Sequence, residues 1–269
     1  SKEYWGYALR IGIPIVPHYL SGIILNQGDR IMIDKMVGKT EVALYGLAYS
    51  IGMLVQLFIS GMNSALTPWM YSKIKKGDIR SMRKVLQLLS VVVVGIAVAL
   101  MLISPELVLI FGSPKYREAV YVIPPVAASV FFIFIYNILS MPQFYYEKTQ
   151  FLMAASMAAA GANVVLNFIF IRLFGYIAAG YTTLACYMLY SVGHYIVSKR
   201  ILVNEGIQEN LMNPGFLLAC SVFLIGASII CNLIFPYRIL RYAILLASAG
   251  LVFWKKELLL KTMADIRKK

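Results

Sequence analysis

The sequence predicts an all-α polytopic membrane protein with about eight transmembrane helices. The chain is 60% apolar and 14% charged, and its mean hydropathy of +0.75 lies outside the usual range of soluble domains. Apolar runs of about 20 residues recur between short charged loops, which is the length a helix needs to cross a hydrocarbon core of about 30 Å. No loop carries a Gly-rich phosphate cradle, so the sequence predicts no ATPase.

The distribution of Lys and Arg among the loops predicts the orientation. The expected spans cover residues 6–36, 42–70, 85–104, 119–141, 150–171, 177–198, 214–235 and 239–254. Seventeen of the 25 Lys and Arg residues then fall on the side of the two termini and seven on the other side. The positive-inside rule therefore predicts cytoplasmic termini. The net charge of +13 is accounted for by these loops, so we expect no nucleic-acid partner.

The first span ends in charged residues that membranes seldom tolerate. An Arg or Asp at a helix centre costs about 2.5–3.5 kcal/mol on insertion scales, so such residues usually face a protein interior or a water-filled path. Arg30 offers a planar, permanently charged fork that matches phosphate or carboxylate. Two roles remain open for it: contact with a ligand, or pairing with Asp29 or Asp34. One helical face of this span carries Tyr19, Gly22, Asn26, Arg30 and Asp34.

The second span carries a polar stripe at helical spacing. A water-accessible cavity and interhelical packing both explain such a stripe. Counting outward from a turn between Lys39 and Thr40 places Arg30 at the depth of Tyr49. We therefore expect the first two spans to border a single cavity. The stripe contains Tyr45, Tyr49, Gly52, Gln56, Ser60, Asn63 and Thr67.

The fifth and sixth spans differ in character. The fifth contains a run of Ala and Gly between Ala154 and Ala162, which favours close helix packing. The sixth span, like the second, carries a polar stripe at helical spacing. Tyr-rich stripes suit sugars, because the ring packs on the apolar sugar face while the hydroxyl finds a polar partner, and they are equally compatible with ordinary packing. Its members are Tyr176, Gly180, Thr183, Tyr187, Tyr190 and His194.

Three carboxylates lie at or near membrane depth. Asp29, Asp34 and Glu147 are candidate ion-coupling residues, because a coupled transporter needs a carboxylate that binds and releases a proton or Na+; each is alternatively a structural partner. The two histidines, His18 and His194, are too few for a metal site. We predict no metal, no cofactor and, because the three cysteines form no CxxC, no disulfide framework.

These residues resemble the C-terminal lobe of bacterial polysaccharide flippases, the Wzx-type branch of the multidrug/oligosaccharidyl-lipid/polysaccharide exporter superfamily. Five blocks spread over residues 6–200 carry the resemblance: Ile24 to Ile33, Tyr45 to Ile51, Pro68 to Tyr71, Tyr145 to Thr149 and Phe174 to Thr183.

The resemblance implies the second of two six-helix bundles in residues 1–200, followed by two additional helices and a basic cytoplasmic tail in residues 201–269. An N-terminal lobe would precede this chain in a longer protein. The implied activity is alternating-access flipping of undecaprenyl-diphosphate-linked oligosaccharide across the bacterial cytoplasmic membrane. The implied substrate-binding residues are Arg30, Asn26, Tyr49, Gln56 and Asn63.

Two other functions remain open. A cation-coupled multidrug exporter of the same superfamily is the nearest alternative. A membrane glycan-assembly enzyme is less compatible, because it would need a sizeable outer loop with catalytic side chains and the sequence offers none. We therefore expect a transporter and not an enzyme.

Overall fold

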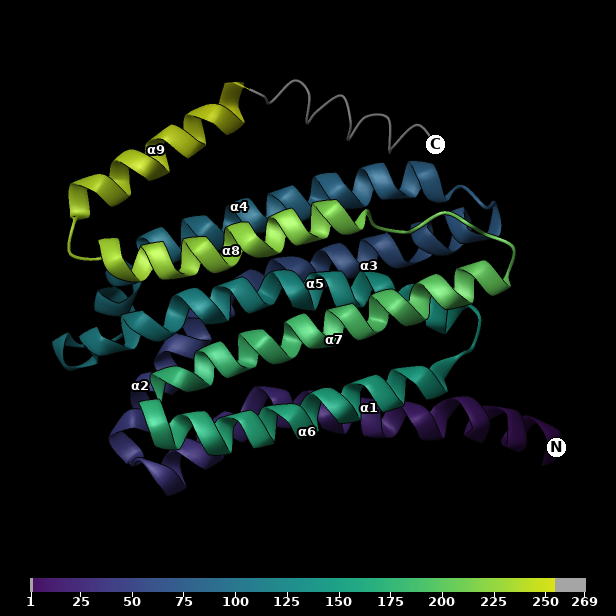
Figure 1. Ribbon diagram of the computed structural model, residues 1–269, viewed down its shortest axis with the longest axis horizontal. Helices are drawn as coiled ribbons and strands as arrows, with labels where there is room; N and C mark the ends of the chain where they lie inside the picture. The colour runs from purple at the N-terminus through teal and green to yellow at the C-terminus, as the bar shows by residue number, and fades with distance from the viewer. Residues whose placement is uncertain (1, 255–269) are drawn as a thin grey trace.

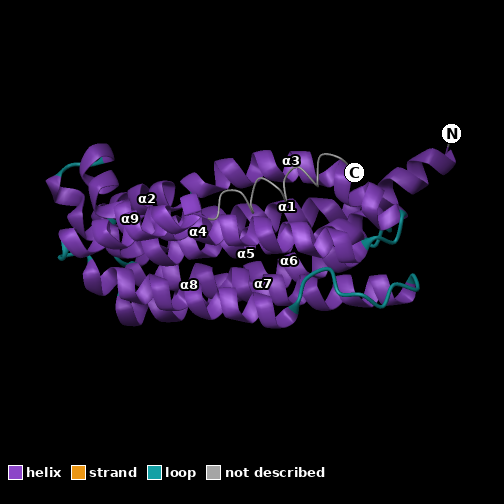
Figure 2. Ribbon diagram, turned by 90° about the horizontal axis from the view of Figure 1, so that it is seen from above, coloured by secondary structure: helices purple, strands orange, loops and turns teal. Residues whose placement is uncertain are grey.

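Long helices running along one axis make up the protein (Figures 1 and 2). The computed structural model describes residues 2–254, apart from some side chains near the two ends of that range. The elements are α1 (Lys2–Met36), α2 (Lys39–Gly52), α3 (Leu54–Lys75), α4 (Ile79–Phe111), the 3-10 helix η1 (Pro114–Val122), α5 (Ile123–Tyr145), α6 (Thr149–Phe174), α7 (Ile177–Asn204), α8 (Pro214–Ile234) and α9 (Arg238–Trp254).

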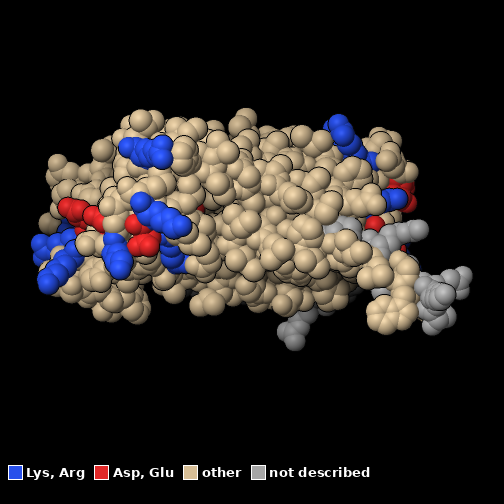
Figure 3. All heavy atoms as spheres, turned by 90° about the horizontal axis from the view of Figure 1, so that it is seen from below, with Lys and Arg blue, Asp and Glu red and all other residues tan. Residues whose placement is uncertain are grey.

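The prediction of an all-α polytopic membrane protein is confirmed. Each predicted span is helical over most of its length, and within residues 2–254 five helical segments are long and apolar enough to cross a membrane. Charged side chains gather toward the two ends of the face in Figure 3 and leave a broad uncharged band between them. α1 and α7 carry the polar faces predicted from the sequence, which lowers their hydropathy. The protein therefore contacts the lipid bilayer through this band.

The second span is not the single helix that its polar stripe predicts. It divides into α2 and α3 at Met53, whose backbone has φ −84° and ψ 1°. A Cβ atom on Gly52 would lie 2.7 Å from Cγ1 of Val126 in α5, so only glycine permits this approach. α2 packs against α5, and the part of the stripe that follows Met53 lies on a separate helix, α3.

α5 lies at the centre of the bundle. It packs against α7, α4, α3 and α8, and almost all of its residues from Ile123 to Leu139 are buried. Pro124 and Pro125 stand at its N-terminal end, where a missing amide donor costs no helical hydrogen bond. α6 packs along α1 (Figure 1). α5 and α7 pack closely together, and α7 also packs against α6.

A cluster of polar contacts around Glu106 joins the start of α9 to α4. The guanidinium of Arg241 donates to both carboxylate oxygens of Glu106 in α4 at 2.8 Å and to the carbonyl oxygen of Leu102 at 2.6 Å. Tyr242 donates to the same carboxylate at 3.0 Å. Because the side chain of Arg241 is only 4% exposed, the pair fixes the entry of α9 onto α4. The division of the chain at residue 200 stays a prediction.

Candidate substrate cavity and buried carboxylate

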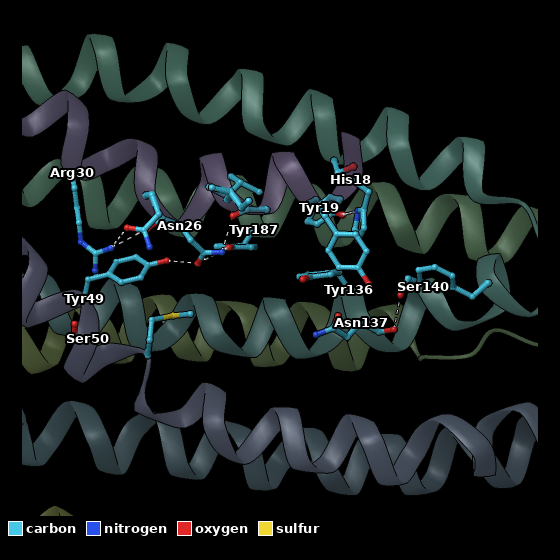
Figure 4. A pocket seen from close by; sticks show the side chains of 18 residues that line it. His18, Tyr19, Asn26, Arg30, Tyr49, Ser50, Tyr136, Asn137, Ser140 and Tyr187 are labelled. Carbon is cyan, nitrogen blue, oxygen red and sulfur yellow. Dashed lines mark hydrogen bonds between the residues drawn. The ribbon is translucent and has the colours of Figure 1, made fainter. Parts of the chain in front are cut away.

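A cavity of about 780 Å³ opens between α1, α2, α5, α6 and α7 (Figure 4). This volume lies within the range of about 300–1,000 Å³ typical of ligand pockets. The side chains that line it are mostly polar or aromatic: His18, Tyr19, Gly22, Ile23, Leu25, Asn26, Gln27, Arg30, Tyr49, Ser50, Met53, Tyr136, Asn137, Ser140, Phe144, Ser156, Tyr187 and Tyr190. The sequence prediction that the first two spans border one cavity is confirmed for α1 and α2.

Arg30 lies at one end of this cavity. Its guanidinium carbon is 4.9 Å from the centre of the Tyr49 ring, so the two residues lie at the same depth, as counting from the turn predicted. Its Nη1 donates to the side-chain oxygen of Gln27 and contacts the Asn26 carbonyl oxygen at 3.5 Å. In the described part of the chain Arg30 forms no ion pair with Asp29 or Asp34. Its direct contacts in the described part of the chain are therefore neutral groups and an aromatic face.

Neutral hydrogen bonds fix the side chains next to Arg30. The hydroxyl of Tyr49 donates to Oδ1 of Asn26 at 2.7 Å, and the hydroxyl of Tyr187 approaches the same oxygen at 3.5 Å. The amide nitrogen of Asn26 donates to the Gly22 carbonyl oxygen at 2.7 Å. These contacts join α1, α2 and α7, so the Arg30 end of the cavity has a defined shape.

Asp29 points away from the cavity into the protein. Its side chain is fully buried, and its carboxylate accepts hydrogen bonds from the hydroxyl of Tyr45, from Nδ2 of Asn167 at 2.6 Å and from the hydroxyl of Thr183 at 2.8 Å. Asn167 also accepts a hydrogen bond from Thr182. These donors come from α2, α6 and α7 and are all uncharged. A carboxylate surrounded by side-chain oxygens and neutral donors can hold a proton or a small cation.

The other predicted site residues lie elsewhere. Asp34 is exposed near the end of α1, and Glu147 lies in the turn between α5 and α6 with φ 57°. Gln56 and Asn63 lie on α3, beyond the bend at Met53, and neither lines the cavity. The structure thus brings Asn26, Arg30 and Tyr49 together and separates them from Gln56 and Asn63, whose role in substrate binding stays a prediction.

The opposite end of the cavity is aromatic. The Tyr136 ring stacks on Tyr187, with centroids 6.3 Å apart and planes 8° apart, and lies 4.6 Å from the Tyr190 ring. The hydroxyl of Tyr190 contacts Nδ1 of His18 at 3.1 Å. Figure 4 shows His18, Tyr19, Tyr136, Asn137 and Ser140 at this end, away from Arg30. The Tyr-rich stripe predicted on the sixth span supplies part of this wall.

Several site residues were not singled out from the sequence. Tyr136 and Asn137 form a polar pair inside the long apolar run of α5, and Asn163 and Asn167 stand four residues apart in the apolar α6. Polar residues at helical spacing inside an apolar span were the available signal. Within the described residues, no group of three His, Cys, Asp or Glu side chains could hold a metal ion.

Comparison with known proteins supports this membrane fold. The model of the MatE family matches residues 14–169, more than half of the chain. Two similar proteins come from Haemophilus influenzae: "Lsg locus putative protein 1" is 29% identical over 159 residues, and an "Uncharacterized membrane protein" is 30% identical over 157 residues.

The alignments cover 56% and 55% of this chain, but only 38% and 37% of the two relatives. The chain therefore spans well under half the length of the curated proteins it matches. No solved structure matches it. The chain belongs to the MatE family, whose members are membrane transporters of the multidrug/oligosaccharidyl-lipid/polysaccharide exporter superfamily.

Proposed function

We propose that this chain is the C-terminal lobe of a transporter that flips undecaprenyl-diphosphate-linked oligosaccharide across the bacterial cytoplasmic membrane by alternating access. Its termini face the cytoplasm in this proposal, and an N-terminal lobe completes the cavity. The observation that carries the proposal is the charge of the cavity wall. Arg30 is the one Lys, Arg, Asp or Glu among the lining residues that the structure describes.

An unpaired guanidinium favours an anionic ligand. Arg binds phosphate oxygens through two parallel N–H donors, and such charge-assisted hydrogen bonds are about twice as strong as neutral ones. The side-chain amide of Gln27 lies at the same end of the cavity and supplies a further donor, whereas the Ser50 hydroxyl donates to the Gly46 carbonyl oxygen. A diphosphate therefore finds both charge and hydrogen bonds here.

The same wall disfavours the drug-exporter alternative. A cavity that binds hydrophobic cations gains affinity from an accessible carboxylate, whereas Asp29 is fully buried and does not line this cavity. A cation entering the cavity would meet Arg30 without a compensating negative side chain. The distribution of charge thus supports a lipid-linked anion over a lipophilic cation.

Asp29 is the ion-coupling residue we favour among the three carboxylates. Its hydrogen bonds join α1 to α2, α6 and α7, so binding or release of a proton or Na+ there changes contacts among four helices. Arg30 follows it directly in α1, and a shift of α1 would move both residues together. This arrangement gives ion binding a direct mechanical link to the substrate cavity.

A cellular export assay tests the proposal. The complete protein carrying Arg30→Ala, Arg30→Lys or the control Arg172→Ala is expressed at matched levels in cells that lack the native flippase. Arg172 has the same charge, lies exposed on α6 and does not line the cavity. We expect glycan export to fall about ten-fold or more in Arg30→Ala, because a charged hydrogen bond contributes about 1.5–3 kcal/mol. Arg30→Lys should retain part of the export.

Unimpaired export in Arg30→Ala would remove the phosphate role. Efflux of hydrophobic cations by the same protein, with no effect of any variant on glycan export, would favour the multidrug exporter instead.

A further inference from the structure

The cavity has two chemically different ends. Tyr19 and Arg30 both line it and stand eleven residues apart in α1, which corresponds to about 16 Å along a helix. Figure 4 shows Arg30 with Tyr49 at one end and Tyr19, Tyr136 and Asn137 at the other. We refer to Tyr19, Tyr136 and Asn137 as the aromatic subsite. The described residues that line the cavity offer no Lys, Arg, Asp or Glu at this end.

The aromatic subsite is held in place by its neighbours. The Tyr136 ring is fixed between Tyr187 and Tyr190 of α7, and the Tyr190 hydroxyl contacts His18 of α1. The His18 and Tyr19 rings lie 5.5 Å apart. Because α5 and α7 are tightly packed, the Tyr136, Tyr187 and Tyr190 rings have little freedom to rearrange when a ligand enters.

The polar atoms of the subsite are available to a ligand. No hydrogen bond joins the hydroxyl of Tyr19, the hydroxyl of Tyr136 or the side-chain amide of Asn137 to another residue that the structure describes. The Tyr19 side chain is 68% exposed in this chain. The subsite therefore offers ring faces together with unused hydroxyl and amide groups. Flat apolar faces rimmed by neutral donors and acceptors complement a sugar ring, which has a C–H face and hydroxyl groups at its edge.

We propose that the aromatic subsite of Tyr19, Tyr136 and Asn137 binds an uncharged sugar ring of the substrate while the diphosphate of the same molecule lies at Arg30. This inference rests on the proposed function and adds the direction in which the substrate lies. The glycan extends along α1 toward its N-terminal half, and the phosphates lie toward the α1–α2 turn. The subsite contains no cation to pair with an acidic sugar, so it selects neutral residues next to the diphosphate.

Binding measurements on the purified complete protein test this. Two probes are compared: farnesyl diphosphate, and the same lipid diphosphate carrying a neutral disaccharide. The wild type should bind the glycosylated probe more tightly. The ratio of the two affinities should fall about ten-fold in Tyr19→Leu, the order expected for a lost ring contact. It should fall about five-fold in Asn137→Ala, the order expected for a lost hydrogen bond. Tyr19→Trp keeps a ring face and should retain most of the gain.

Tyr237→Leu is the matched control. Tyr237 is 64% exposed between α8 and α9 and does not line the cavity, so its loss should leave the affinity ratio unchanged. Circular dichroism and thermal unfolding of each variant exclude misfolding as the cause of a change. Asn137→Ala tests the same affinity ratio independently of Tyr19, because it removes a small side chain and leaves every aromatic ring of the cavity wall in place.

The outcomes separate the inference from the proposed function. Equal affinity of the wild type for both probes, or an undiminished gain in both Tyr19→Leu and Asn137→Ala, overturns the sugar subsite and leaves the phosphate role of Arg30 intact. Tyr19-dependent binding of tetraphenylphosphonium without binding of either diphosphate also overturns it, in favour of a cation site. Unchanged affinity for farnesyl diphosphate in Arg30→Gln contradicts the proposed function itself.

Discussion

Asp29 and Arg30 are neighbours in the sequence with opposite environments. Successive residues on a helix point about 100° apart, so one side chain can face the bundle while the next faces the cavity. Asp29 is buried among Tyr45, Asn167 and Thr183, whereas Arg30 lies against Tyr49 in the cavity wall. The sequence left open whether the two charges pair with each other. The helix geometry points the two side chains in different directions, so they form no direct ion pair and each makes its hydrogen bonds to different neutral groups.

The isosteric change Asp29→Asn tests the ion-coupling role. It removes the negative charge and keeps the shape, so we expect transport to lose its dependence on a proton or Na+ gradient while the protein still folds. Transport is measured in proteoliposomes with and without an imposed gradient of each ion. Asp34→Asn is the control, because Asp34 is exposed and has no contact with the buried donors. Gradient dependence that persists in Asp29→Asn would contradict the role.

At the scale of elements, the bend between α2 and α3 depends on Gly52. A Cβ atom there would meet Cγ1 of Val126 at 2.7 Å and the backbone nitrogen of Ala127 at 3.4 Å. Gly52→Ala should therefore lower the free energy of unfolding by about 1–3 kcal/mol through overpacking. Thermal unfolding in detergent measures it, with Gly61→Ala as control. Gly61 is exposed in α3 with open space around it, so that change should be neutral or stabilising by up to about 1 kcal/mol.

A double variant checks the cause of this effect. If Val126 is the clashing partner, Gly52→Ala combined with Val126→Ala should be less destabilised than the sum of the two single changes. If the losses of unfolding free energy in the two single variants simply add, contact with Val126 is not the reason that residue 52 must be glycine.

The attachment of α9 depends on the Glu106–Arg241 pair. Glu106→Gln leaves the nearly buried Arg241 guanidinium without its counter-charge, and we expect the free energy of unfolding to fall by about 1.5–3 kcal/mol. We expect a loss near the lower end of this range, because the Glu106 side chain is 25% exposed and solvent screens part of the interaction. Hydrogen exchange should rise first in α9. Glu118→Gln, an exposed carboxylate in η1, should have little effect; equal exchange in both variants would contradict the anchoring role.

At the scale of the whole molecule, local periodicity predicted the helices and part of the site. The spacing of Asn26, Arg30 and Tyr49 was enough to place them in one cavity, because a short turn between antiparallel helices fixes their relative depth. The sequence did not predict the break at Met53, and the close approach of Gly52 to Val126 beside it involves a helix far along the chain. For the same reason the partners of Asp29 were missed: Asn167 and Thr183 lie 138 and 154 residues away in sequence.

The membrane potential provides a further test of the transported charge. Moving one elementary charge through 100 mV is worth about 2.3 kcal/mol, so a diphosphate of about −2 gains about 4–5 kcal/mol on leaving a negative interior. We expect an interior-negative potential to speed outward flipping in liposomes, and an imported cation to act mainly on return of the empty carrier. A rate that does not respond to the potential would indicate that the substrate charge is compensated during transport.

The central claim is that the cavity beside Arg30 carries an anionic lipid-linked glycan. Its most direct test is a flipping assay with the purified complete protein in liposomes, in which a glycosylated lipid diphosphate and a lipophilic cation are offered in parallel. We predict that the wild type moves the lipid diphosphate, that Arg30→Ala moves it about ten-fold more slowly or worse at equal incorporation, and that neither moves the cation. Equal flipping by wild type and Arg30→Ala, or transport of the cation alone, would contradict the claim.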